Sequence, residues 1–184
     1  MNYKIRWMTQ SDMESVQKIE VKSFPKPWSK KDFTDCLEVR SKIGKVIEVS
    51  EKIVGFIIYE LMPKGFYIIN IAIDPDYRRL GYGRALVSQL IEKVKQTTND
   101  YGYSKRYFVN SYISDEKVDA HLFFKSLEFK AISIEKNFFN DEEGTFDAYH
   151  FIYKKEEPKV FNRVKANSII HDGENWEGIE WNGI

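Results

Sequence analysis

The sequence predicts a mixed α/β fold with one central sheet, and three observations lead there. Residues 68–73 form a short apolar run rich in β-branched side chains, which is typical of a buried strand. A helix follows, because apolar residues recur there with the spacing of one helical face, at Val87, Leu90, Ile91 and Val94. Strand-like and helix-like segments alternate along the chain and begin in the order β, α, α, β, β, β, α.

The first elements are read from alternation and from capping residues. Residues 3–7 alternate apolar and basic side chains, which predicts a half-buried first strand. Residues 11–14, Ser-Asp-Met-Glu, match a capping box and predict a helix. The prolines within residues 24–28 end that helix, and Ser29 with Asp32 caps a second, shorter one.

The strands around the centre follow. Residues 45–49 and 53–61 flank a tight polar turn and predict a hairpin. Gly65 is expected in the connection to the central strand. Beyond the central helix, residues 97–105 read as a polar loop and residues 106–113 as another strand.

A last helix and a last pair of strands complete the predicted domain. Ser114 and Asp115 are expected to cap a helix that runs to about Leu127, with Val118 and Leu122 facing inward. The segments 131–134 and 147–153 then form an antiparallel pair around an acidic loop at 140–144.

One domain, residues 1–155, therefore accounts for most of the chain. Residues 156–184 form an extension in which Trp176 and Trp181 stand among acidic residues. Its expected role is either to lie on the core or a neighbouring subunit, or to bind a partner.

Composition excludes several classes of protein. Lys+Arg and Asp+Glu total 28 each, so bulk charge favours neither nucleic acid nor a membrane surface as a partner. No apolar run reaches the roughly 18 residues that a bilayer requires. The single cysteine, Cys36, is expected to be buried in a helix, and neither it nor the three histidines have metal-ligand spacing. A cytoplasmic protein without a metal is the expectation.

The stretch after the central strand predicts an anion site. Gly81 and Gly83 lack the Cβ atoms that would keep a phosphate from backbone N–H groups at the start of the helix. Three cations, Arg78, Arg79 and Arg84, surround the same place. The stretch is neither a P-loop nor a dinucleotide fingerprint, because the Gly-Lys-Ser/Thr end and a third glycine are missing.

This stretch, Asn-Ile-Ala-Ile-Asp-Pro followed by Arg78-x-x-Gly81-x-Gly83 and Arg-Ala-Leu, resembles the acyl-CoA loop of the GNAT N-acyltransferases. The resemblance implies a mostly antiparallel mixed sheet of six to seven strands, helices on both faces, and a splayed strand pair that holds acetyl-CoA. Its pyrophosphate would bind amides of the loop, and its pantetheine arm would pair with the central strand. The implied cofactor-binding residues are Ile71, Ala72, Ile73, Arg78, Arg79, Leu80, Gly81, Tyr82, Gly83, Arg84 and Phe124.

Within that superfamily the chain is similar to the N-terminal α-amine acetyltransferases, including the ribosomal-protein alanine acetyltransferases. The similar stretches are Phe-Pro-x-Pro-Trp-Ser at 24–29, the central stretch at 71–78, and Lys-Asn-Phe-Phe at 136–139 with Asp147-Ala148. In the relatives the two outer stretches flank the slot for a peptide N-terminus, and the alternative for these aromatics is core packing. The implied substrate-binding residues are Phe24, Pro25, Trp28, Phe138 and Phe139.

The chain departs from these relatives at the positions for acid–base chemistry. An ungapped count places Phe124 where the family has its general-acid tyrosine, and Tyr112 where it has a glutamate or histidine base. A shift in that count would bring Asp115 or Glu116 towards the site. Tyr67 and Tyr112 remain as the expected catalytic residues, since two hydroxyls can order a water and relay a proton.

The family's helix-start asparagine falls on Lys117, and the glycine of its Leu-Gly-Phe turn on Glu128. His121 and His150 are less favoured as bases than the two tyrosines.

The predicted function is transfer of an acetyl group from acetyl-CoA to a primary amine, foremost a protein or peptide N-terminal α-amine. One alternative is a lysine or small-molecule acceptor. Another is an acyl-CoA-binding sensor or scaffold with weak catalysis. The expected assembly is a monomer or a homodimer.

Overall fold

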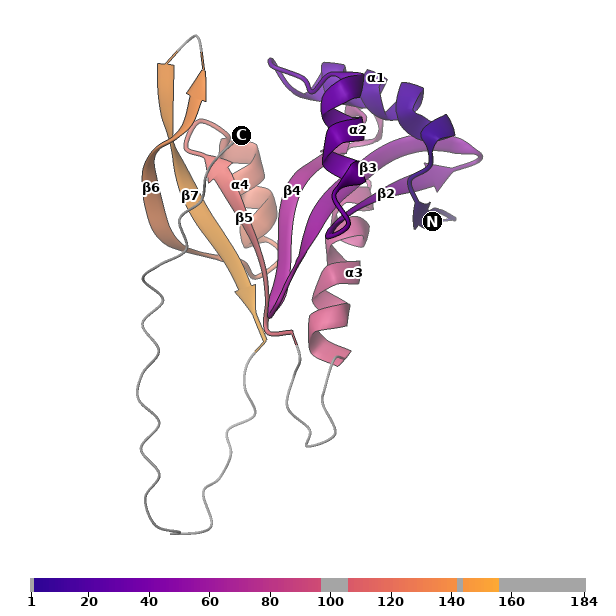
Figure 1. Cartoon of the computed structure of the whole chain (residues 1–184). Coiled ribbons are helices and arrows are strands. Elements are labelled where there is room, and N and C mark those ends of the chain that lie inside the picture. The colour runs from indigo at the N-terminus through magenta and orange to yellow at the C-terminus, as the bar shows by residue number, and fades with distance from the viewer. Residues whose placement is uncertain (1, 97–105, 142–143, 156–184) are drawn as a thin grey trace, which may run out of the picture.

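A computed structural model describes residues 2–96, 106–141 and 144–155 of the chain (Figure 1). Their strands form one sheet in the order β1-β2-β3-β4-β5-β7-β6. Neighbouring strands are antiparallel except β4 and β5, which are parallel. The strands are β1 (Lys4–Trp7), β2 (Lys42–Val49), β3 (Lys52–Met62), β4 (Gly65–Ile73), β5 (Phe108–Ser114), β6 (Lys130–Asp141) and β7 (Gly144–Lys154). The predicted mixed α/β class is confirmed.

Helices cover both faces of this sheet. α1 and α2 pack on one face of β2 to β4, and α3 and α4 pack on the other (Figure 1). The helices are α1 (Met13–Ser23), α2 (Lys30–Glu38), α3 (Tyr82–Gln96) and α4 (Val118–Lys125), with 3-10 turns at Gln10–Asp12 and Pro75–Tyr77. No helix in the described part of the chain is both long and apolar enough to span a bilayer.

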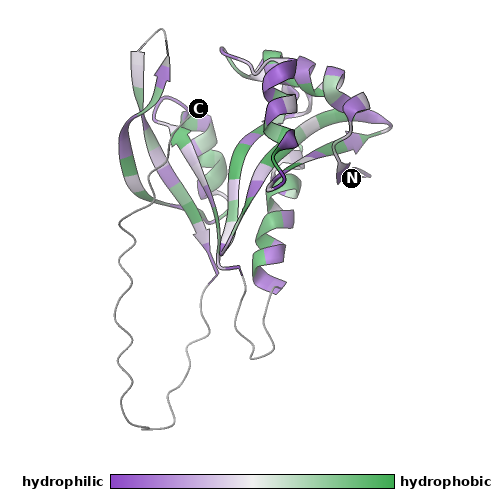
Figure 2. Cartoon of the chain, viewed as in Figure 1, coloured by the Kyte–Doolittle hydropathy of each residue, from purple (hydrophilic) through white to green (hydrophobic). Residues whose placement is uncertain are grey.

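The core has two parts, one on each face of the sheet. The larger one joins α3 and α4 to the strands, and the face of α3 that was predicted from its periodicity, from Val87 to Val94, is buried in it. Hydrophobic and hydrophilic residues alternate along this helix (Figure 2). The smaller one packs α1 and Phe33 of α2 against β2, β3 and β4. Apolar burial on both faces supplies the main driving force for this fold.

The sheet opens where β4 and β5 separate. These strands pair only between Gly65–Tyr67 and residues 108–110, and beyond that they diverge (Figure 1). Gly65 is the first residue of β4 rather than part of the connection before it. A Cβ on Gly65 would lie 2.5 Å from the ring of Phe108, so glycine permits the close approach that joins the two strands.

Three predictions of detail at the helices and at β1 were wrong. The capping box at the start of α1 is formed by Thr9 and Asp12, because a 3-10 turn precedes the helix. Val118 and Leu122 are 60% and 58% exposed, since α4 begins only at Val118 and turns Phe124 inward instead. Trp7 lies on the apolar side of the alternation in residues 3–7, which predicts that it is buried, but it is 60% exposed on the edge strand β1.

The last two strands are longer than predicted. β6 runs to Asp141 and β7 starts at Gly144, so most of the expected loop at 140–144 is strand. Cys36 is half-buried on α2. The predicted loop at 97–105 and the extension at 156–184 lie outside the described residues.

Candidate functional site

The loop between β4 and α3 takes its shape from local residues. Asp74 ends β4 and caps the following 3-10 turn by accepting a hydrogen bond from the N–H of Asp76. Gly81 adopts a φ of +82°, and no atom lies within 4 Å of where its Cβ would be. Glycine is needed there for this left-handed conformation, immediately before α3 begins at Tyr82.

The structure gathers the predicted cofactor residues around one cavity. This donor cavity, of about 350 Å³, lies between the end of β4, the start of α3 and the inner face of α4. Leu80 alone among the predicted residues does not line it, and its side chain is 43% exposed. The predicted residues that do line it are Ile71, Ala72, Ile73, Arg78, Arg79, Gly81, Tyr82, Gly83, Arg84 and Phe124.

Two of the three arginines, Arg78 and Arg84, form hydrogen bonds with residues around this cavity. Arg78 donates to the carbonyl oxygen of Ile73 at 3.0 Å and to the hydroxyl of Ser23 at 3.1 Å. Arg84 donates to the carbonyl oxygen of Ser126 at 3.1 Å. Their positive charge thus faces the cavity from fixed positions, which favours an anionic ligand.

The remaining arginine and Gly83 shape the mouth of the cavity. Arg79 forms an exposed ion pair with Asp119 of α4 at 3.5 Å. A Cβ on Gly83 would lie 3.3 Å from the ring of Phe123, so this glycine lets α3 pack closely against α4. Close packing is a second reason for glycine here, beside the backbone access that the sequence predicted.

A second cavity adjoins the first further along β4, from Ile68 to Ile71. This acceptor cavity, of about 410 Å³, is bounded by residues 24–28, β4, β5 and the β6–β7 hairpin. It contains the predicted substrate residues Phe24, Pro25, Trp28 and Phe139. Phe138 does not line it but stacks on Tyr112, which does, with ring centroids 4.5 Å apart. Trp28 also packs edge-on against Phe33, which agrees with the core-packing reading of this aromatic, whereas its role in substrate binding stays a prediction.

Tyr67 and Tyr112 face each other beside this cavity, as the sequence predicted. Their ring centroids are 6.1 Å apart. Burial raises the pKa of Tyr67 to about 12, with further contributions from Tyr112 and Glu60. Burial, assisted by Glu135, also raises the pKa of Tyr112. Both phenols therefore stay protonated at neutral pH and can donate a proton or a hydrogen bond.

His150 belongs to the same group, although the sequence gave it little weight. Its ring stacks on Tyr112 with centroids 4.4 Å apart, because the two residues are partners across β5 and β7. Its Nε2 lies 3.0 Å from the amide nitrogen of Asn110, which donates to it. Burial lowers the pKa of His150, so its ring is neutral at neutral pH. Cross-strand register was the signal that could have found it.

Three buried polar residues beside the acceptor cavity were missed altogether. Glu20, Asn70 and Ser111 line the cavity, and their side chains are at most 9% exposed. Each lies within an otherwise apolar pattern, where a polar residue indicates a specific partner.

The two cavities meet in the opening between β4 and β5. Phe24, Ile71, Ala120 and Phe124 line both of them. Molecules bound in the two cavities would thus come together beside Ile71. Bringing two reactants together in this way is itself a large catalytic contribution.

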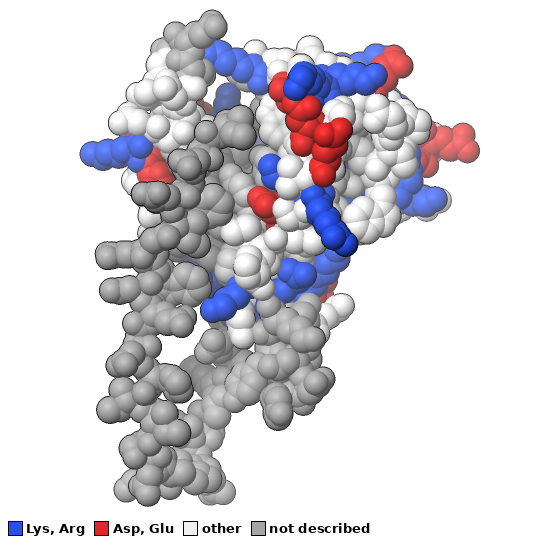
Figure 3. Space-filling view, in the orientation of Figure 1, with Lys and Arg blue, Asp and Glu red and all other residues white. Residues whose placement is uncertain are grey.

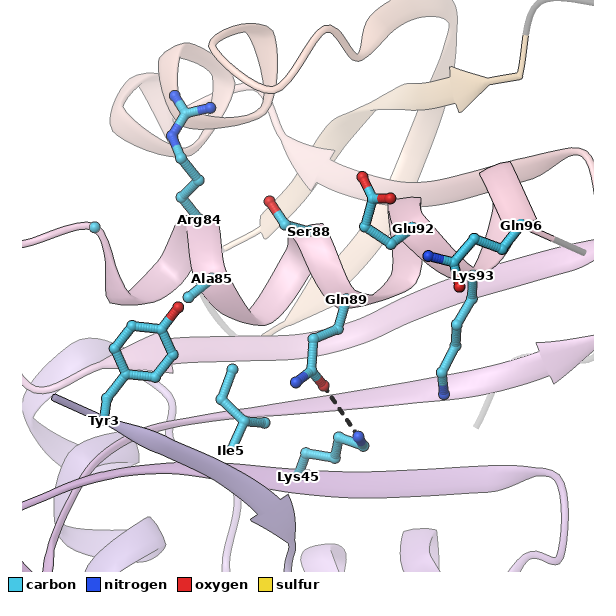
Figure 4. Close-up of a pocket in the computed structure, with 11 residues that line it drawn as sticks. Tyr3, Ile5, Lys45, Arg84, Ala85, Ser88, Gln89, Glu92, Lys93 and Gln96 are labelled. Carbon is cyan, nitrogen blue, oxygen red and sulfur yellow. Dashed lines mark hydrogen bonds between the residues drawn. The ribbon is translucent and has the colours of Figure 1, made fainter. Parts of the chain in front are cut away.

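A third cavity, of about 700 Å³, lies between α3 and β1–β2 (Figure 4). It shares Gly81 and Arg84 with the donor cavity, and Lys45 donates to Gln89 across it at 3.0 Å. On the face shown in Figure 3, acidic and basic side chains are intermingled on the described surface. No group of three or more potential metal ligands occurs among the described residues.

Comparison with known proteins identifies this arrangement. The model of the acetyltransferase (GNAT) family matches residues 13–129. The chain is 27% identical over 138 residues to the ribosomal protein bS18-alanine N-acetyltransferase of Escherichia coli (strain K12), covering 75% of this chain and 88% of that protein. It is 24% identical over 162 residues to an N-alpha-acetyltransferase of Sulfolobus acidocaldarius, covering 81% and 90%.

The fold agrees with these relationships. The crystal structure of the ribosomal-protein-S18-alanine N-acetyltransferase from Escherichia coli matches with a TM-score of 0.71 at 23% identity, covering 86% of this chain and 98% of that chain. The family match spans residues 24–28, β4 and the loop between β4 and α3. The chain therefore belongs to the acetyltransferase (GNAT) family and is an acetyl-CoA-dependent N-acetyltransferase, as its sequence predicted.

Proposed function

We propose that this enzyme transfers the acetyl group of acetyl-CoA to a protein N-terminal α-amine. The observation that carries the proposal is the meeting of two cavities across the β4–β5 opening, one beside a phosphate loop and one walled by aromatic side chains. The relatives named above, which act on ribosomal protein bS18 alanine or as N-alpha-acetyltransferases, support this acceptor.

In the donor cavity, residues 79–84 would hold the pyrophosphate through backbone N–H groups at the start of α3. The positive end of that helix and the guanidiniums of Arg78 and Arg84 favour the same anion. The pantetheine arm would run along Ile71, Ala72 and Ile73. Its amides can take the place of a strand there, because the pairing of β4 with β5 ends at Tyr67.

In the acceptor cavity, Phe24, Pro25 and Trp28 would contact one side of the incoming peptide, with Phe138 and Phe139 on the other. A slot that is open at one end and walled by aromatic side chains can receive the first residue of a peptide while the residues after it remain outside. A free α-amine has a pKa near 8, against about 10.4 for lysine, so a far larger fraction of it than of a lysine is neutral at neutral pH.

The chemistry then requires few groups. The neutral amine attacks the thioester carbon, the new C–N bond forms, and the carbonyl oxygen becomes an oxyanion. The β-bulge at Ile69 frees backbone groups of β4 beside the junction, and an N–H there is the proposed oxyanion donor. The C–S bond breaks, and the phenol of Tyr112 protonates the departing thiolate. The nitrogen of the former amine gives up its proton to water ordered by Tyr67, and that water returns a proton to the Tyr112 phenolate.

A peptide library incubated with acetyl-CoA and read by mass spectrometry tests the acceptor. Half of the peptides carry free N-termini and blocked lysines, and the other half the reverse. Acetylation confined to the first half is the expected result. Acetylation confined to the second half would assign the enzyme to lysine, and no product in either half would leave a small-molecule amine or a sensor role.

The enzyme is further proposed to act in the cytoplasm, as a monomer or a homodimer, with residues 1–155 as its catalytic domain. Fractionation and light scattering test the location and the assembly.

A further inference from the structure

The acceptor loop, residues 24–28, has few backbone N–H groups with which to fix its shape. Pro25 and Pro27 lack an N–H, which leaves three backbone donors in the loop. Two of these belong to the aromatic residues that line the acceptor cavity, Phe24 and Trp28. The positions of both aromatics therefore depend on where their N–H groups find an acceptor.

Both donors go to one residue, Glu20, in the last turns of α1. The N–H of Phe24 donates to the backbone carbonyl oxygen of Glu20 at 3.0 Å. The N–H of Trp28 donates to its carboxylate Oε1, also at 3.0 Å. Glu20 thus fixes the start of the loop through its main chain and the end of the loop through its side chain.

The same carboxylate reaches the central strand. The amide nitrogen of Asn70 donates to Oε1 at 3.2 Å and to Oε2 at 3.1 Å. Asn70 lies on β4 directly before Ile71, where the two cavities meet. One side chain therefore connects α1, the acceptor loop and the strand beside the reaction centre.

Burying the Glu20 carboxylate carries a large desolvation penalty. Glu20 is 1% exposed, and no ion pair to it occurs among the described residues. Burial raises the pKa of Glu20, while the bonds from Trp28 and Asn70 act in the opposite direction. An apolar side chain would fill the space at a lower desolvation cost, but it would leave the N–H of Trp28 without an acceptor.

We propose that Glu20 is a positioning residue of the acceptor site, which holds Phe24 and Trp28 in place relative to β4. The proposal rests on the proposed function, since it assumes that this cavity receives the amine. Glu20 acts through the loop and takes no part in proton transfer. Loss of its side chain should weaken acceptor binding and leave acetyl-CoA binding unchanged. Glu20 does not line the donor cavity, and the main-chain bond that holds Phe24, which does line it, survives the substitution.

Two substitutions at this position and one matched control test the proposal in the full-length protein. Glu20→Ala removes the acceptor of the Trp28 N–H. Glu20→Gln keeps a carbonyl oxygen for Trp28, and Asn70 can turn its own oxygen towards the new amide. Glu14→Ala is the control, because Glu14 lies on the same helix with an 81% exposed side chain.

The first readout is the rate of hydrogen exchange at the Trp28 amide. It can be measured without any amine substrate. Glu20→Ala should speed it about tenfold, equivalent to one lost hydrogen bond, whereas the Gln variant and the control should match the wild type. Unchanged exchange in Glu20→Ala would overturn the proposal. If the wild type acetylates no α-amine, the proposed function fails, but this readout still tests whether Glu20 holds Trp28.

The second readout separates positioning from chemistry, with whichever amine the wild type accepts. Glu20→Ala should raise the acceptor KM about tenfold with the acetyl-CoA Kd unchanged, and Glu20→Gln should restore it. A Gln variant with normal Trp28 exchange but a kcat at least tenfold lower would show that the carboxylate does chemistry, and the proposal would be wrong.

A second variant keeps the proposal testable where Glu20→Ala does not fold. Asn70→Ala removes only the bond to β4 and should raise the acceptor KM about threefold or more, with acetyl-CoA binding again unchanged. An unaltered KM in a folded Asn70→Ala protein would also overturn the proposal.

Discussion

The hydroxyl of Ser111 donates to the carbonyl oxygen of Ile68 at 3.0 Å, directly after the last paired residues of β4 and β5. Beyond Tyr67 the two strands no longer exchange backbone hydrogen bonds. The carbonyl of Ile68 would therefore lie buried without this donor, since Ser111 is only 5% exposed. A side chain thus takes over from the backbone ladder at the point where the opening for the cofactor begins.

Replacing Ser111 by alanine should lower the free energy of unfolding by about 1–3 kcal/mol, the cost of one unsatisfied buried carbonyl. Urea denaturation measures this. Ser133→Ala, at an exposed serine on β6, is the control and should change stability little. Equal effects of both substitutions would mean that the Ser111 bond contributes nothing specific.

Replacing Tyr67 by phenylalanine should lower kcat about 10- to 100-fold and leave the acetyl-CoA Kd unchanged. The pKa of Tyr67, about 12, also predicts the pH dependence. A phenol that acts in its protonated form loses activity only as pH rises through that value, so the wild-type rate should show no decline from Tyr67 below about pH 11. A decline of the rate near pH 8–9 that disappears in Tyr67→Phe would contradict this assignment. Tyr3→Phe, at an exposed tyrosine, is the control.

Replacing Gly83 by valine should weaken acetyl-CoA binding at least about tenfold, because the new side chain would press on Phe123 and Ile73, which line the donor cavity. Its backbone is helical, so the fold should remain. Calorimetry measures the affinity and circular dichroism the fold. Ser88→Val is the control, because it introduces the same side chain further along α3. An unchanged acetyl-CoA affinity in Gly83→Val would remove the anion-site assignment.

Replacing Asp119 by asparagine should tighten acetyl-CoA binding roughly two- to fivefold at low salt. The substitution removes a negative charge from the cavity mouth and releases Arg79 from its ion pair. Both groups are exposed, so the gain should disappear at high salt. Asp35→Asn on α2 controls for net charge alone, and a gain of the same size there would argue against a local effect.

Replacing Glu128 by glycine should stabilise the protein by about 1 kcal/mol. Glu128 has a φ of +67° and ends α4 in a turn where the N–H of Phe129 reaches the carbonyl of Phe124 at 3.2 Å. Thermal denaturation should give a higher Tm for Glu128→Gly and no change for Glu128→Ala, which keeps the side-chain strain.

The sequence by itself determined the strand–loop–helix unit around Gly81, and with it the family and the grouping of the loop residues around one cavity. Those predictions held because β4, the loop and α3 are contiguous, so periodicity and backbone chemistry within a short stretch specify them. The same holds for the cap at Ser29 and for the hairpin of β2 and β3. Each depends on residues a few positions apart.

Only the tertiary structure decided what crosses between distant elements. Glu20 and Asn70 are 50 residues apart, and His150 meets Tyr112 through the register of β5 and β7. Val118 and Leu122 lie outward because packing against the sheet, rather than their own spacing, selects the buried face of a short helix. The sequence around a single polar residue such as Glu20 does not reveal its hydrogen-bond partner, because that partner lies on an element far away in the chain.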